Sequence, residues 1–193
     1  MPPFSNSYLI IGLGNPGRRY ERTRHNVGFM VLNRIAEKLN AVFRKGRSSY
    51  EIVDVHWNES AVLLAKPTTY MNNSGIAVAE MVRYYNISLS NTLVVVDEIE
   101  LPLGRLRLRK QGSSGGHNGL QSIIQQLGQQ TFARLRIGIG TEFAKRDMVD
   151  FVLSNFSRNE QEILDPVLDT CVEAIGSFIH AGIDKTMNLF NKN

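Results

Sequence analysis

Two histidines in this sequence lie where a catalytic base could act. His25 lies in a basic loop and His117 in a glycine-rich loop, and each directly precedes a segment with a helical pattern. The ordinary pKa of histidine lies near neutral pH, so its imidazole can accept and release protons there. A histidine base also needs an orienting partner, and Asp97, which ends the apolar run 93–96, is the best carboxylate available. The sequence therefore offers two candidate bases and one orienting acid.

The sequence lacks the motifs that other catalytic strategies require. The sequence contains no H-x-x-x-H or H-x-H pair and no second cysteine beside Cys171, so no metal motif is present and we expect neither a metal nor a cofactor. It also lacks the G-x-S-x-G elbow of a serine hydrolase. The remaining option is direct attack by a water that histidine and aspartate activate. This chemistry suits an ester better than an amide, because an alkoxide needs less assistance to leave than an amine.

Asparagine recurs beside glycine or proline in three loops, 14–16, 71–75 and 116–119. A neutral amide offers both a donor and an acceptor, so several of them would suit a polar, uncharged substrate such as a peptide backbone. The alternative is that asparagine next to glycine simply makes turns. The sequence leaves both interpretations open.

Positive charge concentrates on one predicted strand, where Arg105, Arg107 and Arg109 alternate with leucines. Side chains two residues apart on a strand share a face and lie roughly 6.6 Å apart, close to the spacing of phosphates along a nucleic acid strand. The whole chain has a net charge of +4, but its acidic residues gather in the last third. This separation favours a polyanionic partner. The alternative is an edge strand kept soluble by its charges.

Gly12, Gly14 and Gly17 have the G-x-G-x-x-G spacing of a dinucleotide-binding loop. That motif requires a helix to begin inside the loop, so that its amides meet the pyrophosphate. Here Pro16 interrupts the spacing, and residues 18–24 show no apolar stripe that could pack against a sheet. The pattern therefore disfavours a nicotinamide or flavin enzyme.

Segments with strand and helix patterns alternate along the chain. The predicted strands cover 8–13, 49–56, 61–66, 92–96, 103–109 and 135–139, with a hairpin between the second and third. The predicted helices cover 27–39, 76–85, 118–127 and a long segment from the capping box of Ser157 and Glu160 to 179, bent or interrupted at Pro166, with a short helix after Gly182. We therefore expect an α/β fold in which one domain, residues 1–193, holds a mixed β-sheet between helices in three layers.

Composition places the chain among ordinary globular proteins, with 42% apolar and 21% charged residues. No apolar run approaches the roughly 20 residues of a membrane helix. The N-terminus lacks the features of a signal peptide, and the single cysteine fits a reducing compartment, where a buried structural thiol is its expected role. We expect a cytoplasmic protein that does not associate with membranes.

The motifs together resemble those of bacterial-type peptidyl-tRNA hydrolases, in order and over nearly the whole chain. The matching segments are Gly12–Gly17, Tyr20 with Thr23–Phe29, Lys66–Gly75, Asp97–Glu98, Gly112–Leu120 and Arg134–Gly140. Two departures occur, at Glu98-Ile99-Glu100, where the family commonly has Asp or Glu, then Leu-Asp, and at Thr141-Glu142, where it often has a basic residue and proline. The second departure bears on phosphate contacts rather than on the chemistry.

The resemblance implies a monomeric hydrolase that cleaves the ester between a nascent peptide and tRNA and so recycles tRNA. It implies that His25 is the base, that Asp97 tunes it, and that Asn15 distinguishes peptidyl from free aminoacyl groups. It further implies contacts to the peptidyl end and the tRNA 3′ terminus from a larger set, namely Asn72 and Asn118, with Tyr20, Tyr70 and Met71 lining the groove. We expect His117 to belong to this substrate-binding set. Basic positions that would hold the acceptor stem are Arg107, Arg109 and Arg136.

Two other functions compete with this one. An RNA-binding module on the same scaffold, with catalysis lost or secondary, would keep the arginines, but the intact His25, Asp97 and asparagine set argues against it. An oxidoreductase is a distant third. Which asparagine would stabilise the oxyanion is left open by the sequence.

Overall fold

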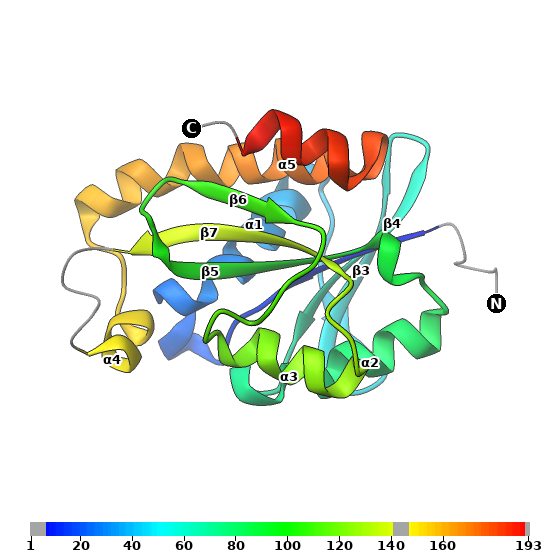
Figure 1. The fold of residues 1–193 in the computed structure, drawn as a ribbon, viewed down its shortest axis with the longest axis horizontal. Helices are drawn as coiled ribbons and strands as arrows, with labels where there is room; N and C mark the ends of the chain where they lie inside the picture. The colour runs from blue at the N-terminus through cyan, green and yellow to red at the C-terminus, as the bar shows by residue number, and fades with distance from the viewer. Residues whose placement is uncertain (1–6, 141–146, 192–193) are drawn as a thin grey trace.

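A mixed β-sheet runs through the middle of the molecule (Figure 1). The computed structural model describes residues 7–140 and 147–191, and within them seven strands lie in the order β2-β3-β4-β1-β5-β7-β6. The strands are β1 Tyr8–Gly12, β2 Arg44–Lys45, β3 Tyr50–Trp57, β4 Ser60–Pro67, β5 Thr92–Pro102, β6 Leu106–Arg109 and β7 Ala133–Gly140. β1 pairs in parallel with β4 and β5, and β5 with β7, whereas β2, β3 and β6 join through antiparallel pairs.

Helices cover both faces of the sheet, which confirms the predicted three-layer α/β arrangement (Figure 1). On one face lie α1 Val27–Lys38 and α5 Arg158–Phe190, and on the other lie α2 Ser74–Tyr85 and α3 Asn118–Leu127. Alternate residues of β1 and β5 enter the two cores: Ile10 and Val95 pack towards α1 and α5, Leu9 and Val94 towards α2 and α3. Burial on both faces explains the unbroken apolar runs of these strands.

The parallel pairing gathers the functional loops at one edge of the sheet. β1, β4, β5 and β7 run in the same direction, so their carboxyl ends meet there. Ligands of open α/β sheets bind at this edge. The loops after β1 and β4 carry several of the residues singled out above, and Asp97 lies within β5 beyond its apolar run.

Several elements differ from the sequence-based expectations. β5 continues to Pro102, β6 begins only at Leu106, and β2 and the short helix α4, Met148–Leu153, were not predicted. Pro166 does not interrupt α5, whose only non-helical backbone among the described residues is at Gly182, with φ 78°. A proline removes one hydrogen bond of a long helix, whereas a left-handed glycine reverses the local backbone and ends the regular ladder.

Gly12, the first glycine of the dinucleotide-like spacing, is required by packing. In the described chain the loop continues into the 3-10 turns Arg18–Tyr20 and Arg24–Asn26, and no α-helix begins before Val27. A Cβ on Gly12 would lie 2.3 Å from the carbonyl oxygen of Gly28, and a Cβ on Gly28 would lie 2.5 Å from that of Val95. Only glycine lets α1 begin directly against β1 and β5, which brings the turn before α1 close to β5.

Two further predictions concern Cys171 and the Thr141-Glu142 segment. Cys171 is fully buried in α5, as a structural thiol should be. The Thr141-Glu142 departure lies outside the described residues. Among the residues described, no helix has the length and apolar character that would let it cross a membrane.

Candidate active site

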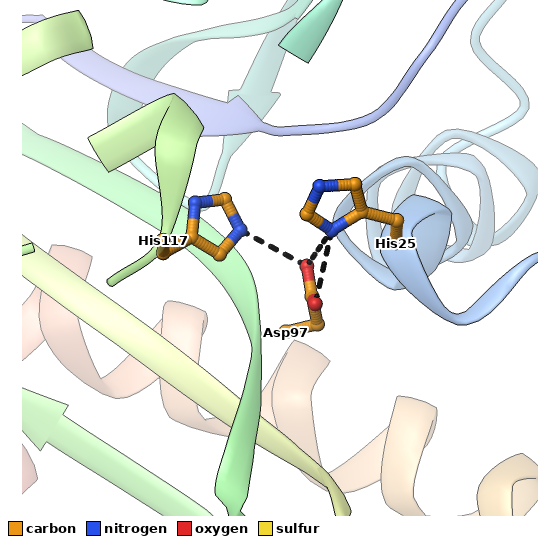
Figure 2. Close-up of side chains that lie close together, drawn as sticks. All are labelled: His25, Asp97 and His117. Carbon is orange, nitrogen blue, oxygen red and sulfur yellow. Dashed lines mark hydrogen bonds and ion pairs between the residues drawn. The ribbon is translucent and has the colours of Figure 1, made fainter. Parts of the chain in front are cut away.

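His25 and Asp97 meet although they come from different elements (Figure 2). His25 lies in the 3-10 turn Arg24–Asn26, and Asp97, which is 5% exposed, lies within β5. Nδ1 of His25 lies 2.8 Å and 3.0 Å from the two carboxylate oxygens of Asp97. An ionised carboxylate only accepts hydrogen bonds, so Nδ1 carries the proton and Nε2 of the neutral ring keeps its lone pair. His25 thus presents the nitrogen that a general base needs.

His117 binds the same carboxylate but has no free nitrogen. It is the N-cap of α3, where its Nδ1 accepts hydrogen bonds from the backbone N–H groups of Gly119 and Leu120, at 3.1 Å and 3.2 Å. The proton of its neutral ring is therefore on Nε2, which donates to Oδ1 of Asp97 at 3.0 Å (Figure 2). Of the two candidate bases, only His25 keeps a nitrogen available.

The two imidazoles set the charge state of Asp97. Burial opposes ionisation of this carboxyl, but the nearby rings of His117 and His25 and their hydrogen bonds outweigh it and hold the pKa of Asp97 well below its ordinary value. Asp97 therefore remains a carboxylate across the working pH range. It can stabilise a positive charge that forms on His25.

Arg24 anchors the turn that carries His25. Its buried guanidinium donates to Ser154 Oγ at 2.7 Å, to the carbonyl oxygen of Asn155 at 2.6 Å and to both carboxylate oxygens of Glu160 at 2.7 Å. Glu160 lies in the first turn of α5, so the anchor connects the turn before α1 with the start of α5. The sequence showed Arg24 only as one of several basic loop residues.

Asn15 is held so that its amide nitrogen is the group left for a ligand. Asn26, 1% exposed, accepts from the backbone N–H of Asn15 and donates to its carbonyl oxygen, both at 2.9 Å. Oδ1 of Asn15 accepts from the backbone N–H of Met71 at 2.8 Å. The amide oxygen is thus already used, and the NH₂ group can donate. Asn26 stands inside a matching motif, yet the sequence gave it no role.

A pocket of about 350 Å³ collects most of the predicted site residues. The predicted residues that line it are Asn15, His25, Tyr70, Met71, Asn72, Asp97, His117 and Asn118. The opposite lining is apolar and comes from α4, through Met148, Val149, Val152 and Leu153. The sequence did not indicate this wall, because α4 is short and its apolar residues are exposed in part.

Four of the predicted substrate-binding residues lie outside this pocket. Tyr20 does not line it and instead lies under the guanidinium of Arg19, 4.5 Å from the ring centre. Arg136 on β7 pairs with Glu98 and donates to the carbonyl oxygen of Ser113 at 2.9 Å. The other two, Arg107 and Arg109, belong to β6.

The arginines of β6 line a separate groove of about 470 Å³ between this strand and the end of α5. Arg105, Arg107 and Arg109 all line it, together with Phe190 and Asn191. None of the three forms an ion pair with any residue that the structure describes. Their charges are therefore available to a polyanion.

The cluster of His25, Asp97 and His117 is also the place where a cation could be considered. Its potential ligand atoms lie within 4.8 Å of one another. Coordination by Nε2 of His117 would move the proton to Nδ1, which would break the caps to Gly119 and Leu120. The hydrogen bonding of His117 therefore favours a proton network over a metal centre.

Comparison with known proteins gives a consistent result. Residues 9–193 match the family model described as peptidyl-tRNA hydrolase. The chain is 45% identical over 183 residues to the peptidyl-tRNA hydrolase of Citrifermentans bemidjiense, covering 95% of this chain and 97% of that protein. It is 46% identical over 185 residues to that of Bacteroides fragilis, covering 96% and 98%. A crystal structure of the Acinetobacter baumannii peptidyl-tRNA hydrolase matches at a TM-score of 0.90 and 34% identity, covering 97% of this chain and 95% of that one.

Proposed function

The chain belongs to the peptidyl-tRNA hydrolase family, and from this we propose that it hydrolyses the ester bond between peptide and tRNA in peptidyl-tRNA, with His25 as the base that activates water. The observation that carries the mechanism is the contact of His25 with Asp97 in a pocket bordered by the amide of Asn15. It leaves one basic nitrogen, one fixed negative charge and one hydrogen-bond donor around a space that can hold an ester.

In the proposed reaction Nε2 of His25 takes a proton from water while the water oxygen attacks the ester carbonyl carbon. The imidazolium is stabilised by Asp97, which remains ionised. The tetrahedral intermediate then collapses, the bond from carbon to the ribose oxygen breaks, and the proton on Nε2 passes to that oxygen. The products are a peptide with a free carboxyl group and tRNA with a free 3′-terminal hydroxyl.

We assign stabilisation of the oxyanion to Asn15. Its Oδ1 is engaged by Met71, so its NH₂ group is a fixed donor at the pocket wall. A donor that is oriented before the reaction stabilises developing negative charge without reorganisation. Asn72 and Asn118 line the same pocket and supply the remaining amides for the first peptide unit. A substrate with a free amino group would leave these amides unpaired, which penalises free aminoacyl-tRNA.

The tRNA acceptor stem is proposed to lie along β6 and β7. In the antiparallel pairing of β6 with β7, Arg107 lies opposite Arg136 and Arg109 lies opposite Arg134. Arg107 and Arg109 have no carboxylate partner among the described residues, so they can bind phosphates directly. Arg136 must share its guanidinium between Glu98 and a phosphate.

The test is hydrolysis of an N-blocked aminoacyl-tRNA beside the free aminoacyl-tRNA. We expect release only from the blocked ester, and we expect His25→Ala to abolish turnover while leaving tRNA affinity nearly unchanged. His56→Ala, which changes an exposed histidine of β3, is the matched control and should keep full activity. Near-normal hydrolysis by His25→Ala would refute the mechanism. Binding of the blocked substrate without release by the wild-type protein would instead identify an RNA-binding module.

A further inference from the structure

A second polar pocket borders Asn15, and neither His25 nor Asp97 lines it. It has a volume of about 250 Å³ and is lined by Asn15, Asn26, Asn33, Glu51, Lys66 and Thr68, among others. Asn15 also lines the pocket of His25, so this residue is a wall common to both. The volume is slightly below the range of sites for drug-sized ligands, which suits a short piece of chain.

The strand order places this second pocket on the opposite side of Asn15 from the catalytic pair. Asn15 follows β1, whose two neighbours in the sheet are β4 and β5. β5 carries Asp97, whereas β4 ends in Lys66 and Pro67 and leads to Thr68. The sequence of sites along the sheet edge is therefore the arginines of β6 and β7, the acid of β5, the amide after β1, and the pocket beside β4.

The lining of the second pocket can pair with a peptide backbone. The ammonium of Lys66, whose side chain is 11% exposed, lies 3.1 Å from Oδ1 of Asn33 and 3.0 Å from a carboxylate oxygen of Glu51. It also lies over the ring of Phe43, 3.9 Å from the centroid. The side chains of Asn33, Glu51 and Thr68 are acceptors for N–H groups, and Lys66 and Thr68 are donors for carbonyls. A mixed set of this kind favours an uncharged polar chain over a phosphate, because a phosphate would meet Glu51.

We propose that this pocket binds the peptide units that precede the ester-linked residue, so that the enzyme recognises peptidyl chains longer than one residue. The proposal rests on the proposed function, which fixes the ester beside His25. In this arrangement the arginines of β6 bind the tRNA on one side of the ester. The peptide chain extends from the ester past Asn15 towards β4 on the other side. Asn26 braces Asn15 from this side, through two hydrogen bonds of 2.9 Å.

The experiment compares two substrates that differ only in chain length, an N-acetyl-aminoacyl-tRNA and an N-acetyl-tripeptidyl-tRNA with the same tRNA and the same ester-linked residue. Asn33→Trp, from α1, and Thr68→Trp, from the loop after β4, each place a bulky ring in the pocket. Asn33→Trp also removes a partner of Lys66, which Thr68→Trp leaves in place, so agreement between them excludes an effect of the lost hydrogen bond. Glu37→Trp, one turn further along α1 on an exposed position that does not line the pocket, is the matched control.

We expect the wild-type protein to favour the longer substrate through KM, and both pocket variants to lower the long-to-short ratio of kcat/KM by about tenfold. Glu37→Trp should leave the ratio unchanged. The proposal is overturned if the wild-type ratio is one, or if the pocket variants slow both substrates equally.

A binding measurement separates this outcome from failure of the proposed function. If the protein released neither peptide, the hydrolase assignment would fall, but the affinity of His25→Ala for the two substrates would still decide the pocket. The pocket proposal is supported if His25→Ala binds the longer substrate more tightly and the double variant His25→Ala with Asn33→Trp does not. Equal affinities of His25→Ala for the two substrates refute it.

Discussion

The ring of His117 is fixed by the protein rather than by the substrate. Two backbone N–H groups hold its Nδ1, and its Nε2 donates to the carboxylate that orients His25. The sequence predicts that His117 contacts the substrate. We infer from these hydrogen bonds that it has a second function, as a residue that positions Asp97 and His25. His117 and His25 both hydrogen-bond to the carboxylate of Asp97.

Replacing His117 by asparagine separates its two functions. Asparagine is a good N-cap, so α3 should keep its stability, whereas His117→Ala should lose about 1 kcal/mol of unfolding free energy. Both variants lose the donor to Asp97, whose full charge then acts on His25 alone. We expect a lower kcat and an acid limb of the pH–rate profile that moves to higher pH, measured beside urea unfolding. An unchanged pH profile in His117→Asn would show that the ring serves only as a cap.

A second prediction concerns the side-chain NH₂ group of Asn15. In Asn15→Asp the oxygen bound by Met71 remains, but the donor at the pocket wall becomes an acceptor with negative charge. We expect kcat/KM to fall by about 100-fold or more, because removal of one oxyanion donor costs that much in comparable sites. Asn73→Asp, an exposed neighbour of the pocket loop, is the control. Hydrolysis by Asn15→Asp within a few-fold of wild type would contradict the assignment.

At the scale of elements, the first turn of α5 positions the turn that carries His25. Ser157 and Glu160 form a capping box, and the two carboxylate oxygens of Glu160 also accept two of the hydrogen bonds that the Arg24 guanidinium donates. The sequence predicted the capping box correctly, but not that its acid also holds the residue before His25. A helix near the C-terminus thus fixes a turn near the N-terminus.

The Arg24–Glu160 pair predicts a pH-dependent loss of stability. Burial opposes ionisation of Glu160, but hydrogen bonds from the Ser157 backbone and from Arg24 outweigh it and lower its pKa. A lowered folded pKa contributes stability above the unfolded value, about 4.3, that disappears as pH falls through the folded value. Glu160→Gln should therefore lose about 2 kcal/mol at pH 7 and clearly less near pH 3, by urea unfolding. Glu162→Gln, an exposed acid 3.8 Å from Arg158, should change little at either pH. Equal losses for Glu160→Gln at both pH values would contradict this account.

At the scale of the whole molecule, charge is ordered along the sheet. The arginines of β6, which have no ion-pair partner among the described residues, lie at the β6 edge, whereas Asp165 and Asp169 of α5 pair with Arg34 of α1. A net charge of +4 is small, so the affinity for tRNA depends on where the charges lie.

Salt dependence measures this arrangement. Each phosphate contact that is lost lowers the slope of log K against log salt by about 0.9 on duplex nucleic acid. We expect Arg107→Gln and Arg109→Gln each to reduce the slope by about that amount and to weaken tRNA binding, with kcat nearly unchanged. Arg158→Gln, whose side chain is 92% exposed on α5, should leave the slope as it is. Unchanged slopes in both strand variants would place the acceptor stem elsewhere.

The sequence by itself located most of the elements and indicated which residue types the site would use. Apolar runs and helical periodicity depend on neighbours along the chain, so they located most strands, α1, α3 and the break at Gly182. Residue types indicated a histidine, an aspartate and amides, and Pro16 correctly argued against a dinucleotide loop. β2 and α4 were missed because two and six residues, none of them buried, leave little periodicity.

Only the tertiary structure decided which histidine has a free nitrogen. The answer depends on what each imidazole meets: for His117 the first amides of its own helix, for His25 a strand far along the chain. The same holds for the donor orientation of Asn15 and for the anchor of Arg24, whose partners come from other elements. Contacts of this kind follow from the order of strands in the sheet, and a pattern that reports burial along one segment carries no information about that order.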